Sequence, residues 1–584
     1  RCGHCSAASR AGALSVSPVR IEQRQAPSSL GLDDDLLARV YSARGIEDSQ
    51  QLERGLGKLL SPADLPDIER AAQRLADALE QNEKILIVGD FDADGATSVA
   101  LCLLALRAMG ALQVDFLVPN RFDYGYGLSP EIVHLAAAME PSVIVTVDNG
   151  VASVDGVALA NASGIDVIVT DHHLPGDVLP DAHALVNPNV GDNSFASKAM
   201  AGVGVAYYLL SWLRQTLRQR DYFSARGIPE PNMAQYLDLV ALGTVADVVP
   251  LDQNNRILVH QGLLRMQRGM VRPGIAALAR VGKRDLTTLS AADVGFAIGP
   301  RLNAAGRLQD MSVGIRCLVT DDPAEAGQLA AALDGLNQTR RDIEQGMVVD
   351  AEMILTQITP SPDETGIAVY HESFHQGVVG IVAGRLREKF HRPAIVFADA
   401  SDTSDELKGS ARSIEGLNIR DVLDSIATRL PGMLLKFGGH AMAAGLSIKR
   451  VHLQRFQKAF DKAVKAAVTA DMLDAVLLTD GALTSEQLNL DTVAKFADAG
   501  PWGNGFAEPQ FVGVFKLVNQ RVVGQDHLKL VLGFNDRVID AIAFRQAPLQ
   551  GQPEEVRAVY KPALNDYGGR QTLQLIVEYL EAMS

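Results

Sequence analysis

Three carboxylates fall within five residues in the segment Gly89–Gly95, which reads Gly-Asp-Phe-Asp-Ala-Asp-Gly. Mutual repulsion among Asp90, Asp92 and Asp94 is costly unless a cation neutralises them. A calcium-binding loop is one source of such a pattern, but its twelfth position, counted from Asp90, would be Leu101 rather than Glu. The spacing therefore favours a different kind of cation site.

Two further polar turns and one isolated acid carry groups of the same chemistry. They are Asp148-Asn149-Gly150, Asp171-His172-His173 and Asp247, the last within the apolar stretch Gly243–Pro250. Carboxylates mixed with imidazole suit Mn²⁺, Mg²⁺ or Fe²⁺ better than a structural zinc. Such a set can hold two ions about 4 Å apart, which activate water and stabilise phosphoryl displacement. Each residue alone has an ordinary interpretation, since an Asp after a strand is often a helix N-cap.

The acids follow apolar runs that have the length and composition of buried strands. The expected strands are Lys84–Val88, Leu112–Val118, Ser142–Val147 and Asp166–Thr170, separated by helical segments at Thr97–Met109, Pro130–Met139 and Val151–Ser163. Alternating strands and helices predict an α/β fold with a parallel sheet covered on both faces. Ligands bind beyond the carboxyl ends of such strands, so we expect the acids and imidazoles to share one edge.

The rest of the chain divides by changes in its pattern. We expect an extension over residues 1–35, a catalytic domain over 36–275, a helical connector over 276–360, a second α/β lobe over 361–475 and an all-β domain over 476–584. Within the connector, Leu329–Ile354 predicts one long helix. In the last domain, Phe511–Val514, Arg521–Val523, Leu528–Leu532, Val538–Phe544, Glu555–Val559 and Leu573–Tyr579 predict short strands of a barrel or sandwich.

Composition bounds the class of protein. The net charge of −16 taken alone disfavours a nucleic-acid partner, although it describes the whole surface and not one groove. The second lobe is less acidic, with 11 Lys and Arg against 9 Asp and Glu over residues 371–450. Four cysteines are too few for a disulfide framework, and no apolar run reaches 18 residues. We therefore expect a cytoplasmic protein without a membrane span. Because no sequence pattern indicates a dimer interface, we expect a monomer.

Several segments have features of phosphate or strand binding, each with a structural alternative. Arg121, Tyr124 and Tyr126 lie in a Gly-rich segment and offer a cation and stacking faces, or a turn with packed tyrosines. Gly438-Gly439-His440 exposes backbone suited to a phosphate, or forms a tight turn. Tail residues Trp502, Phe506, Phe511 and Lys529 fit a strand-binding barrel or its core, and for Phe511 we expect the core.

Together these motifs resemble the DHH phosphoesterase superfamily, named for the triplet present here as Asp171-His172-His173. The closer resemblance is to the RecJ family of single-strand-specific 5′→3′ DNA exonucleases, and it covers about residue 35 to the end without a departure at any motif position. The matching segments are Gly89–Gly95, Asp148–Gly150, Asp171–His173, Gly243–Pro250, Gly299–Arg307, Lys408–Ser413 and Gly438–Gly445. The resemblance implies a DHH catalytic domain, a long connecting helix, a DHH-associated domain and a C-terminal OB-like barrel.

The resemblance also implies roles for individual residues. The implied ligands of two ions, Mn²⁺ or Mg²⁺, are Asp92, Asp94, Asp148, His172 and Asp247, with Asp148 as bridge and Asp90 as a weaker candidate. Asp171 and Asn149 would support the ligands, and His173 would orient the site or meet the scissile phosphate. Arg301 would contact the scissile region. The implied substrate-binding residues are Arg121, Tyr124, Tyr126, Asn303, Arg307, Ser410, Arg412, Gly438, Gly439 and His440.

The implied activity is two-metal hydrolysis of single-stranded DNA from its 5′ end, releasing 5′ mononucleotides in recombination and repair. A narrow passage between the lobes would exclude a duplex, and a helicase and a single-strand-binding protein are the implied partners. Two alternatives stay open. One is a phosphodiesterase of short oligonucleotides or cyclic dinucleotides, or a pyrophosphatase, against which the β-rich tail argues. The other is a non-catalytic replication scaffold, against which the complete ligand set argues.

Overall fold

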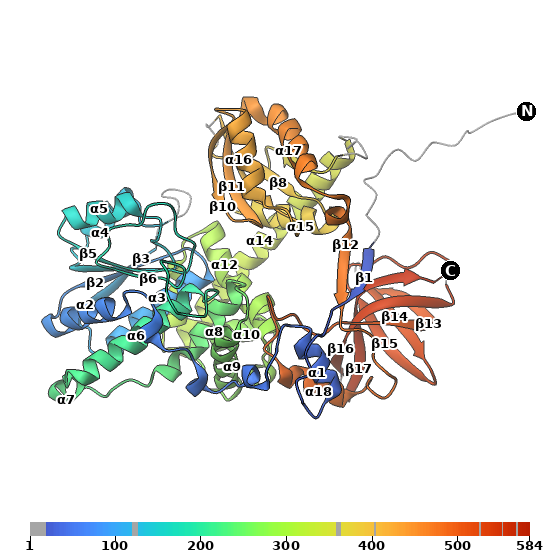
Figure 1. Ribbon diagram of the computed structural model, residues 1–584, viewed down its shortest axis with the longest axis horizontal. Helices are drawn as coiled ribbons and strands as arrows, with labels where there is room; N and C mark the ends of the chain where they lie inside the picture. Colours follow the sequence, from blue (N-terminus) through green and yellow to red (C-terminus); the bar gives the residue numbers. More distant parts are fainter. Residues whose placement is uncertain are drawn as a thin grey trace, which may run out of the picture. The chain divides into compact units, whose positions relative to one another are not determined.

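The computed structural model describes residues 19–118, 127–357, 364–401, 405–524, 527–551, 553–567 and 570–583. The chain forms two compact units, coloured along the sequence in Figure 1. One contains residues 23–337 and 479–584, and the other contains residues 338–478 with the N-terminal residues up to Glu22. The catalytic sheet and the C-terminal barrel therefore belong to the same unit.

The catalytic sheet is parallel, with strand order β3-β2-β4-β5-β6. Its strands are β2 (Ile85–Gly89), β3 (Val114–Leu117), β4 (Val143–Val147), β5 (Asp166–Thr170) and β6 (Ala184–Val186). The first four confirm the predicted strands, whereas β6 was not predicted because it is only three residues long. Gly89, Val147 and Thr170 stand in register at the carboxyl edge. The residues that follow each of them must therefore meet at one place.

Helices cover both faces of this sheet, because β-branched and leucine side chains point alternately to each face. One face packs against α2 (Ile68–Gln81), α3 (Ala93–Ala108) and α6 (Gly202–Gln219), and the other against α4 (Pro130–Ala137) and α5 (Val154–Ala162). Beyond α3 lie α8 (Leu237–Ala246) and α9 (Gln253–Gln267), which pack on each other. Helix α8 is buried along most of its length and ends at Asp247.

A helical connector follows, and it ends in one long helix. Its helices are α10 (Pro273–Val281), α11 (Ala291–Asp293), α12 (Gly299–Leu308), α13 (Ser312–Val319) and α14 (Pro323–Gln357), with a π-helical turn over Val294–Ile298. Helix α14 has 35 residues. This confirms the predicted long helix and extends it at both ends.

The second unit holds a five-stranded sheet of order β10-β11-β9-β8-β7. Its strands are β7 (Ile367–Tyr370), β8 (Ala394–Asp399), β9 (Glu406–Arg412), β10 (Leu434–Gly439) and β11 (Ala443–Lys449). Helix α15 (Val379–Phe390) packs on β8 and β9 from one side, while α16 (Ile419–Arg429) and α17 (Leu453–Ala467) pack on the other face (Figure 1). The predicted strands over Gly366–Tyr370 and Ala394–Ala398 correspond to β7 and β8.

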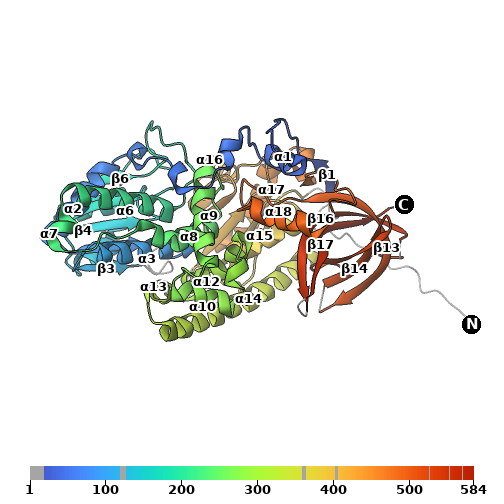
Figure 2. The same ribbon diagram turned by 90° about the horizontal axis from the view of Figure 1, so that it is seen from below.

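The C-terminal strands close into a five-stranded barrel of order β13-β14-β15-β17-β16. They are β13 (Phe511–Val523), β14 (His527–Phe534), β15 (Arg537–Ala543), β16 (Glu555–Tyr567) and β17 (Arg570–Ala582). Six strands were predicted, and the number is wrong because the first two are the ends of the continuous β13. Phe511 is fully buried, as expected. Helix α18 (Leu490–Ala499) lies beside β16 (Figure 2).

The N-terminal region differs from the prediction of an extension through residue 35. Residues Val19–Gln23 form β1, which pairs with β12 (Ala475–Thr479), and α1 (Asp35–Ser42) buries Leu36 and Val40 in the barrel's core cluster. Only β1 therefore lies within the predicted extension, where its backbone pairing orders the chain, whereas α1 begins at the predicted end of that extension. No helix within the described ranges is both long and apolar enough to span a bilayer.

Candidate functional site

Carboxylates and imidazoles converge at the carboxyl edge of the catalytic sheet, where the in-register strand ends require it. Three groups have ligand atoms within 4.8 Å of one another: Asp90, Asp92 and Asp148; Asp94, His172 and Asp247; and Asp148, His172 and His173. Asp148 and His172 each belong to two of these groups. Through these two shared residues the three groups form one continuous cluster of possible cation ligands.

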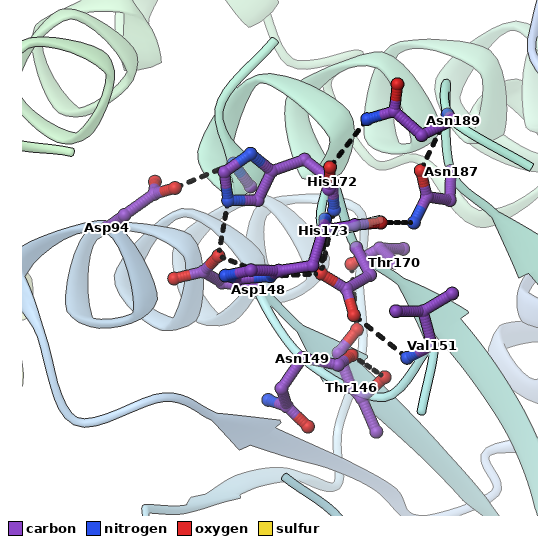
Figure 3. Close-up of polar contacts among 12 residues, drawn as sticks. Asp94, Thr146, Asp148, Asn149, Val151, Thr170, His172, His173, Asn187 and Asn189 are labelled. Carbon is purple, nitrogen blue, oxygen red and sulfur yellow. Dashed lines mark hydrogen bonds and ion pairs between the residues drawn. The ribbon is translucent and has the colours of Figure 1, made fainter. Parts of the chain in front are cut away.

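His172 joins the strand ends to helix α8. Its Nε2 atom lies 3.1 Å from Asp148 Oδ1 and 3.6 Å from Asp247 Oδ2. Figure 3 shows the His172 ring directed toward Asp148. An imidazole nitrogen between two carboxylate oxygens is the geometry of shared coordination to a cation. Side chains 75 positions apart in the sequence, His172 and Asp247, are thus brought into direct contact.

The N-terminus of α6 fixes Asp94 by two backbone hydrogen bonds. The amides of Gly202 and Val203 donate to the two carboxylate oxygens of Asp94 at 2.6 and 2.9 Å. A Cβ atom at Gly202 would lie 2.7 Å from the Asp148 Cβ, and one at Gly243 would lie 2.9 Å from Asp94 Oδ1. Both positions therefore require glycine, because the ligands pack directly against bare backbone.

Helix α12 holds the loop that carries Asp92. The Asp92 carboxylate caps α3 by accepting from the amides of Asp94 and Gly95, and Asn303 Oδ1 accepts from the next amide, Ala93 N, at 2.8 Å. Gly306 of the same helix sits so close that a Cβ would lie 1.7 Å from the Phe91 carbonyl oxygen. Asn303 was predicted to bind substrate, whereas here it orders the carboxylate loop.

Burial and mutual repulsion give the carboxylates strong affinity for positive charge. Burial, reinforced by the charge of Asp92, raises the pKa of Asp94 to about 7. Burial and the neighbouring Asp94 raise the pKa values of Asp148 and Asp247 well above the usual range. A divalent cation relieves both costs. The oxygen-rich donor set with one or two imidazoles fits Mn²⁺ or Mg²⁺.

Asp171 binds the backbone of His172 and His173 and the side chain of His173. One of its oxygens accepts from the His172 and His173 amides at 2.8 and 3.1 Å and lies 2.7 Å from His173 Nδ1, while the other accepts from Val151 N (Figure 3). Burial opposes ionisation of both partners, but their hydrogen bond prevails, so that the pKa of Asp171 is lowered and that of His173 is raised. The contact therefore favours the charged forms of both Asp171 and His173.

Three asparagines set the backbone around these ligands. Asn149 donates to the carbonyls of Val88 and Val147, which ties β4 to β2. Asn187 donates to the His173 carbonyl at 2.9 Å and Asn189 to the His172 carbonyl at 2.7 Å (Figure 3). Sequence reasoning missed the last two, although a polar Asn-Pro-Asn segment directly after an apolar run is a detectable signal.

Two predicted arginine contacts have different outcomes. Arg301 is buried, donates to Asp334 at 2.9 Å and to the Ala297 carbonyl, and forms an ion pair with Asp334. It therefore ties α12 to α14, and its contact with the scissile region stays a prediction. Arg307 lies half-buried in the last turn of α12. Arg121, Tyr124 and Tyr126 lie outside the described residues.

A second candidate site lies on the sheet of the other unit. Lys408, Ser410 and Arg412 alternate along β9 on the face that α15 covers, and Arg412 Nη1 donates to Ser410 Oγ at 3.2 Å. A Cβ at Gly380, in the first turn of α15, would lie 3.0 Å from both side chains. Burial, together with the nearby charge of Arg387, lowers the pKa of Arg412. This combination favours an anion.

Bare backbone borders that arginine. Gly445 of β11 pairs with Ser410, and Gly438 of β10 pairs with Gly445, so the three stand in a row across the sheet. A Cβ at either glycine would meet open space. Gly439 has φ of 140°, and the His440 amide closes the hairpin by donating to the Ala443 carbonyl. The segment is thus a tight turn, and its glycines leave space on the sheet beside the Arg412 side chain.

Comparison with known proteins gives three matched family models. They are the DHH family N-terminal domain over residues 84–244, the DHHA1 domain over 363–466 and the RecJ OB domain over 479–579. The first contains the carboxylates and imidazoles of the sheet edge other than Asp247, the second contains Ser410 and Arg412, and the third contains most of the barrel. The N-terminal elements before β2, helix α9 and the connector lie outside the three models.

Curated relatives and solved structures agree with these models. The chain is 52% identical to the single-stranded-DNA-specific exonuclease RecJ of Dickeya dadantii, over 93% of this chain and 96% of that protein, and 48% identical to RecJ of Escherichia coli, over 96% and 98%. A crystal structure of RecJ in complex with Mn²⁺ from Thermus thermophilus matches with a TM-score of 0.79 at 29% identity, covering 97% of this chain and 80% of that chain.

Proposed function

The chain belongs to the RecJ family of single-stranded-DNA-specific exonucleases, and we propose that it degrades single-stranded DNA from the 5′ end and releases 5′ mononucleotides. The observation that carries this proposal is the convergence of five carboxylates and two imidazoles at one sheet edge. Solved structures of relatives hold Mn²⁺ or Mg²⁺, and the donor set here fits the same ions.

The proposed metal ligands are Asp92, Asp94, Asp148, His172 and Asp247. Asp90 is a weaker candidate for the same role. Bound divalent ions supply the positive charge that activates water and stabilises the developing phosphoryl oxyanion. The protein's own task is to hold its ligands still. The amides of α6 fix Asp94, and Asp171 holds the His173 ring through a contact of 2.7 Å at Nδ1. We assign to His173 a contact with the scissile phosphate, to which its ring can donate a hydrogen bond.

We further propose that Ser410 and Arg412 bind the terminal 5′ phosphate. The guanidinium is largely buried beside the hydroxyl and a helix N-terminus, which is a favourable arrangement for a phosphate dianion. Gly438, Gly439 and His440 would offer backbone to the following nucleotide. Arg121, Tyr124, Tyr126 and Arg307 remain candidates for contacts along the strand.

The domain assignment that follows is a catalytic DHH domain over residues 36–275, a connector over 276–360, a DHH-associated domain over 361–475 and an OB-like domain over 476–584. The family models at 84–244, 363–466 and 479–579 support these limits. We propose a cytoplasmic monomer that acts in recombination and repair with a helicase and a single-strand-binding protein.

The test is digestion of a 5′-phosphorylated 40-nucleotide strand and of its duplex, with Mn²⁺ or Mg²⁺. We expect mononucleotides from the single strand and little release from the duplex. A strand labelled at its 3′ end and blocked at its 5′ end should keep its label. Early release of that label would contradict the polarity, and equal rates on dinucleotides and long strands would favour a short-oligonucleotide phosphodiesterase instead.

A further inference from the structure

Val248, directly after Asp247, has a backbone conformation that its side chain disfavours. Its φ is 61°, in the left-handed region, and valine is β-branched. The side chain is 63% exposed, so burial of its methyl groups does not compensate. A conformation of this kind persists only where surrounding contacts impose it. Its position beside a proposed metal ligand directs attention to those contacts.

The backbone of Val248 is held from two sides. Its amide donates to the Val245 carbonyl at 3.3 Å at the end of α8, and its carbonyl is bound from the OB-like domain. Asn504 Nδ2 donates to the Val248 carbonyl at 2.7 Å, and Leu251 N donates to the Asn504 carbonyl at 2.7 Å. One residue, more than 250 positions further along the chain, thus binds the backbone on both sides of Val249 and Pro250. On its other side Asp247 is held by α8, since its amide donates to the Gly243 carbonyl at 2.9 Å.

The loop that carries Asn504 is rigid and closely seated. Gly503 and Phe506 exchange backbone hydrogen bonds of 2.9 and 3.1 Å across it. A Cβ at Gly503 would lie 2.7 Å from the Leu251 side chain, and Gly505 has φ of 70° with its Cβ position 3.3 Å from Pro250. Glycine at both positions lets two backbones approach within direct hydrogen-bonding distance.

An aromatic anchor fixes this loop to the catalytic domain. Phe506 is fully buried and stacks with Trp502 and Tyr41. The guanidinium of Arg256 lies 4.4 Å from the centre of the Phe506 ring and donates to the Leu251 carbonyl at 3.0 Å. Trp502 and Phe506, which the sequence indicated as possible contacts to a DNA strand, thus pack inside the protein instead. Through Arg256 they connect the Asn504 loop to Leu251.

We propose that Asn504 is a positioning residue for the metal ligand Asp247, acting through the left-handed link at Val248. In this arrangement the OB-like domain completes the metal centre in addition to any contact it makes with DNA. The inference rests on the proposed metal-dependent function, because it assigns Asn504 to the ligand set of that site. It assigns no chemical step to Asn504 itself.

The test compares Asn504→Ala with a matched variant, Gln520→Ala, in the full chain. The Gln520 side chain, like that of Asn504, bonds to backbone: it donates to the Leu549 carbonyl and accepts from the Leu549 amide, both at 3.0 Å. The Asn504 side chain makes one such bond, to Val248, and its backbone bond with Leu251 is kept in the alanine variant. We expect Asn504→Ala to weaken one of two Mn²⁺ equivalents about 10-fold in calorimetric titration, the usual scale for residues that orient a ligand. Its kcat should fall with an unchanged KM for DNA, while Gln520→Ala should bind Mn²⁺ like the wild type.

A second substitution distinguishes positioning of Asp247 from a general loss of contact between the OB-like domain and the catalytic domain. Asparagine tolerates the left-handed region far better than valine, so Asn504→Ala combined with Val248→Asn should recover most of the Mn²⁺ affinity. Equal Mn²⁺ affinity in the wild type and Asn504→Ala, or equal losses in the two alanine variants, would overturn the inference. Failure of the wild type to bind Mn²⁺ at all would instead overturn the proposed function on which it rests.

Discussion

The carboxylate edge of the catalytic sheet and the β9 face of the second sheet solve opposite electrostatic problems. At the first, burial and neighbouring acids raise the pKa values of Asp94, Asp148 and Asp247. At the second, burial and Arg387 lower the pKa of Arg412. Each site concentrates one sign of charge at a cost to the folded protein, and each cost is removed by a ligand of the opposite sign.

The two sites also differ in how their backbones are held. Asp148 and Val248 have φ values of 61° at the carboxylate edge. The surrounding backbone is fixed by the Gly202 amide of α6, by Asn303 Oδ1 of α12, which accepts from Ala93 N, and by Asn504 of the OB-like domain. The β9 face is a regular sheet in ladder register, with open glycines at Gly438 and Gly445. Reaction chemistry thus occupies the tightly fixed site, while the regular sheet suits the binding of a flexible strand end.

The largest effect should come from Asp148→Asn, which removes the carboxylate common to two ligand groups. We expect exonuclease activity to fall on the order of 10³-fold, because cation stabilisation of the phosphoryl charge depends on this oxygen. The metal-free variant should melt at a higher temperature than the wild type, since a buried charge among like charges is gone. Nucleotide release and thermal unfolding with and without Mn²⁺ measure both effects, and retained Mn²⁺-dependent stabilisation would contradict the assignment.

A smaller and more selective effect is expected from Arg412→Ala. Charge-assisted hydrogen bonds contribute about 1.5–3 kcal/mol, so the preference for a 5′-phosphorylated strand over a 5′-hydroxyl strand should fall by about 10- to 100-fold. Hydrolysis of the 5′-hydroxyl strand should change little. Exposed Arg420, on α16 of the same domain, gives the matched variant Arg420→Ala. A uniform loss on both strands would assign Arg412 to general backbone binding instead.

The difference between the two sites also explains what sequence reasoning could find. Most of the carboxylates could be predicted because they directly follow strands, and the parallel register brings the ends of those strands together, whereas Asp247 follows helix α8. Arg301 was not, because its direction depends on Asp334 of another helix, and Asn504 was not, because its partner Val248 lies in another domain. Strand β6 was too short to show a pattern, whereas the β9 residues were located but their open glycine floor depends on cross-strand pairing.

Asn303→Ala should have an intermediate effect at the carboxylate edge alone. The substitution removes the acceptor for Ala93 N at the start of α3, a loss of about 1 kcal/mol of stability on the scale of helix caps. Mn²⁺ affinity and kcat should fall about 10-fold while the 5′-phosphate preference stays intact. Calorimetric titration and paired substrates measure these quantities. A change in KM without a change in Mn²⁺ affinity would return Asn303 to the substrate-binding role that the sequence predicted.

The smallest expected effect is a shift of a few degrees in the melting temperature as the pH changes. Its pH dependence should come from the carboxylate edge and not from the β9 face. Unfolded aspartates titrate near 3.9, while folded Asp94 titrates at about 7, so the metal-free folded state binds more protons between these values. Its stability should therefore fall as pH rises from 5.5 to 7.5.

Mn²⁺ competes with those protons and should reverse this dependence of stability on pH, because the affinity for Mn²⁺ increases as the protons leave. Asp148→Asn should flatten both slopes, whereas Arg412→Ala should leave them unchanged, because Arg412 is not part of the carboxylate cluster. Metal-free melting temperatures that rise over this range would contradict the raised carboxylate pKa values and, with them, the electrostatic contrast between the two sites.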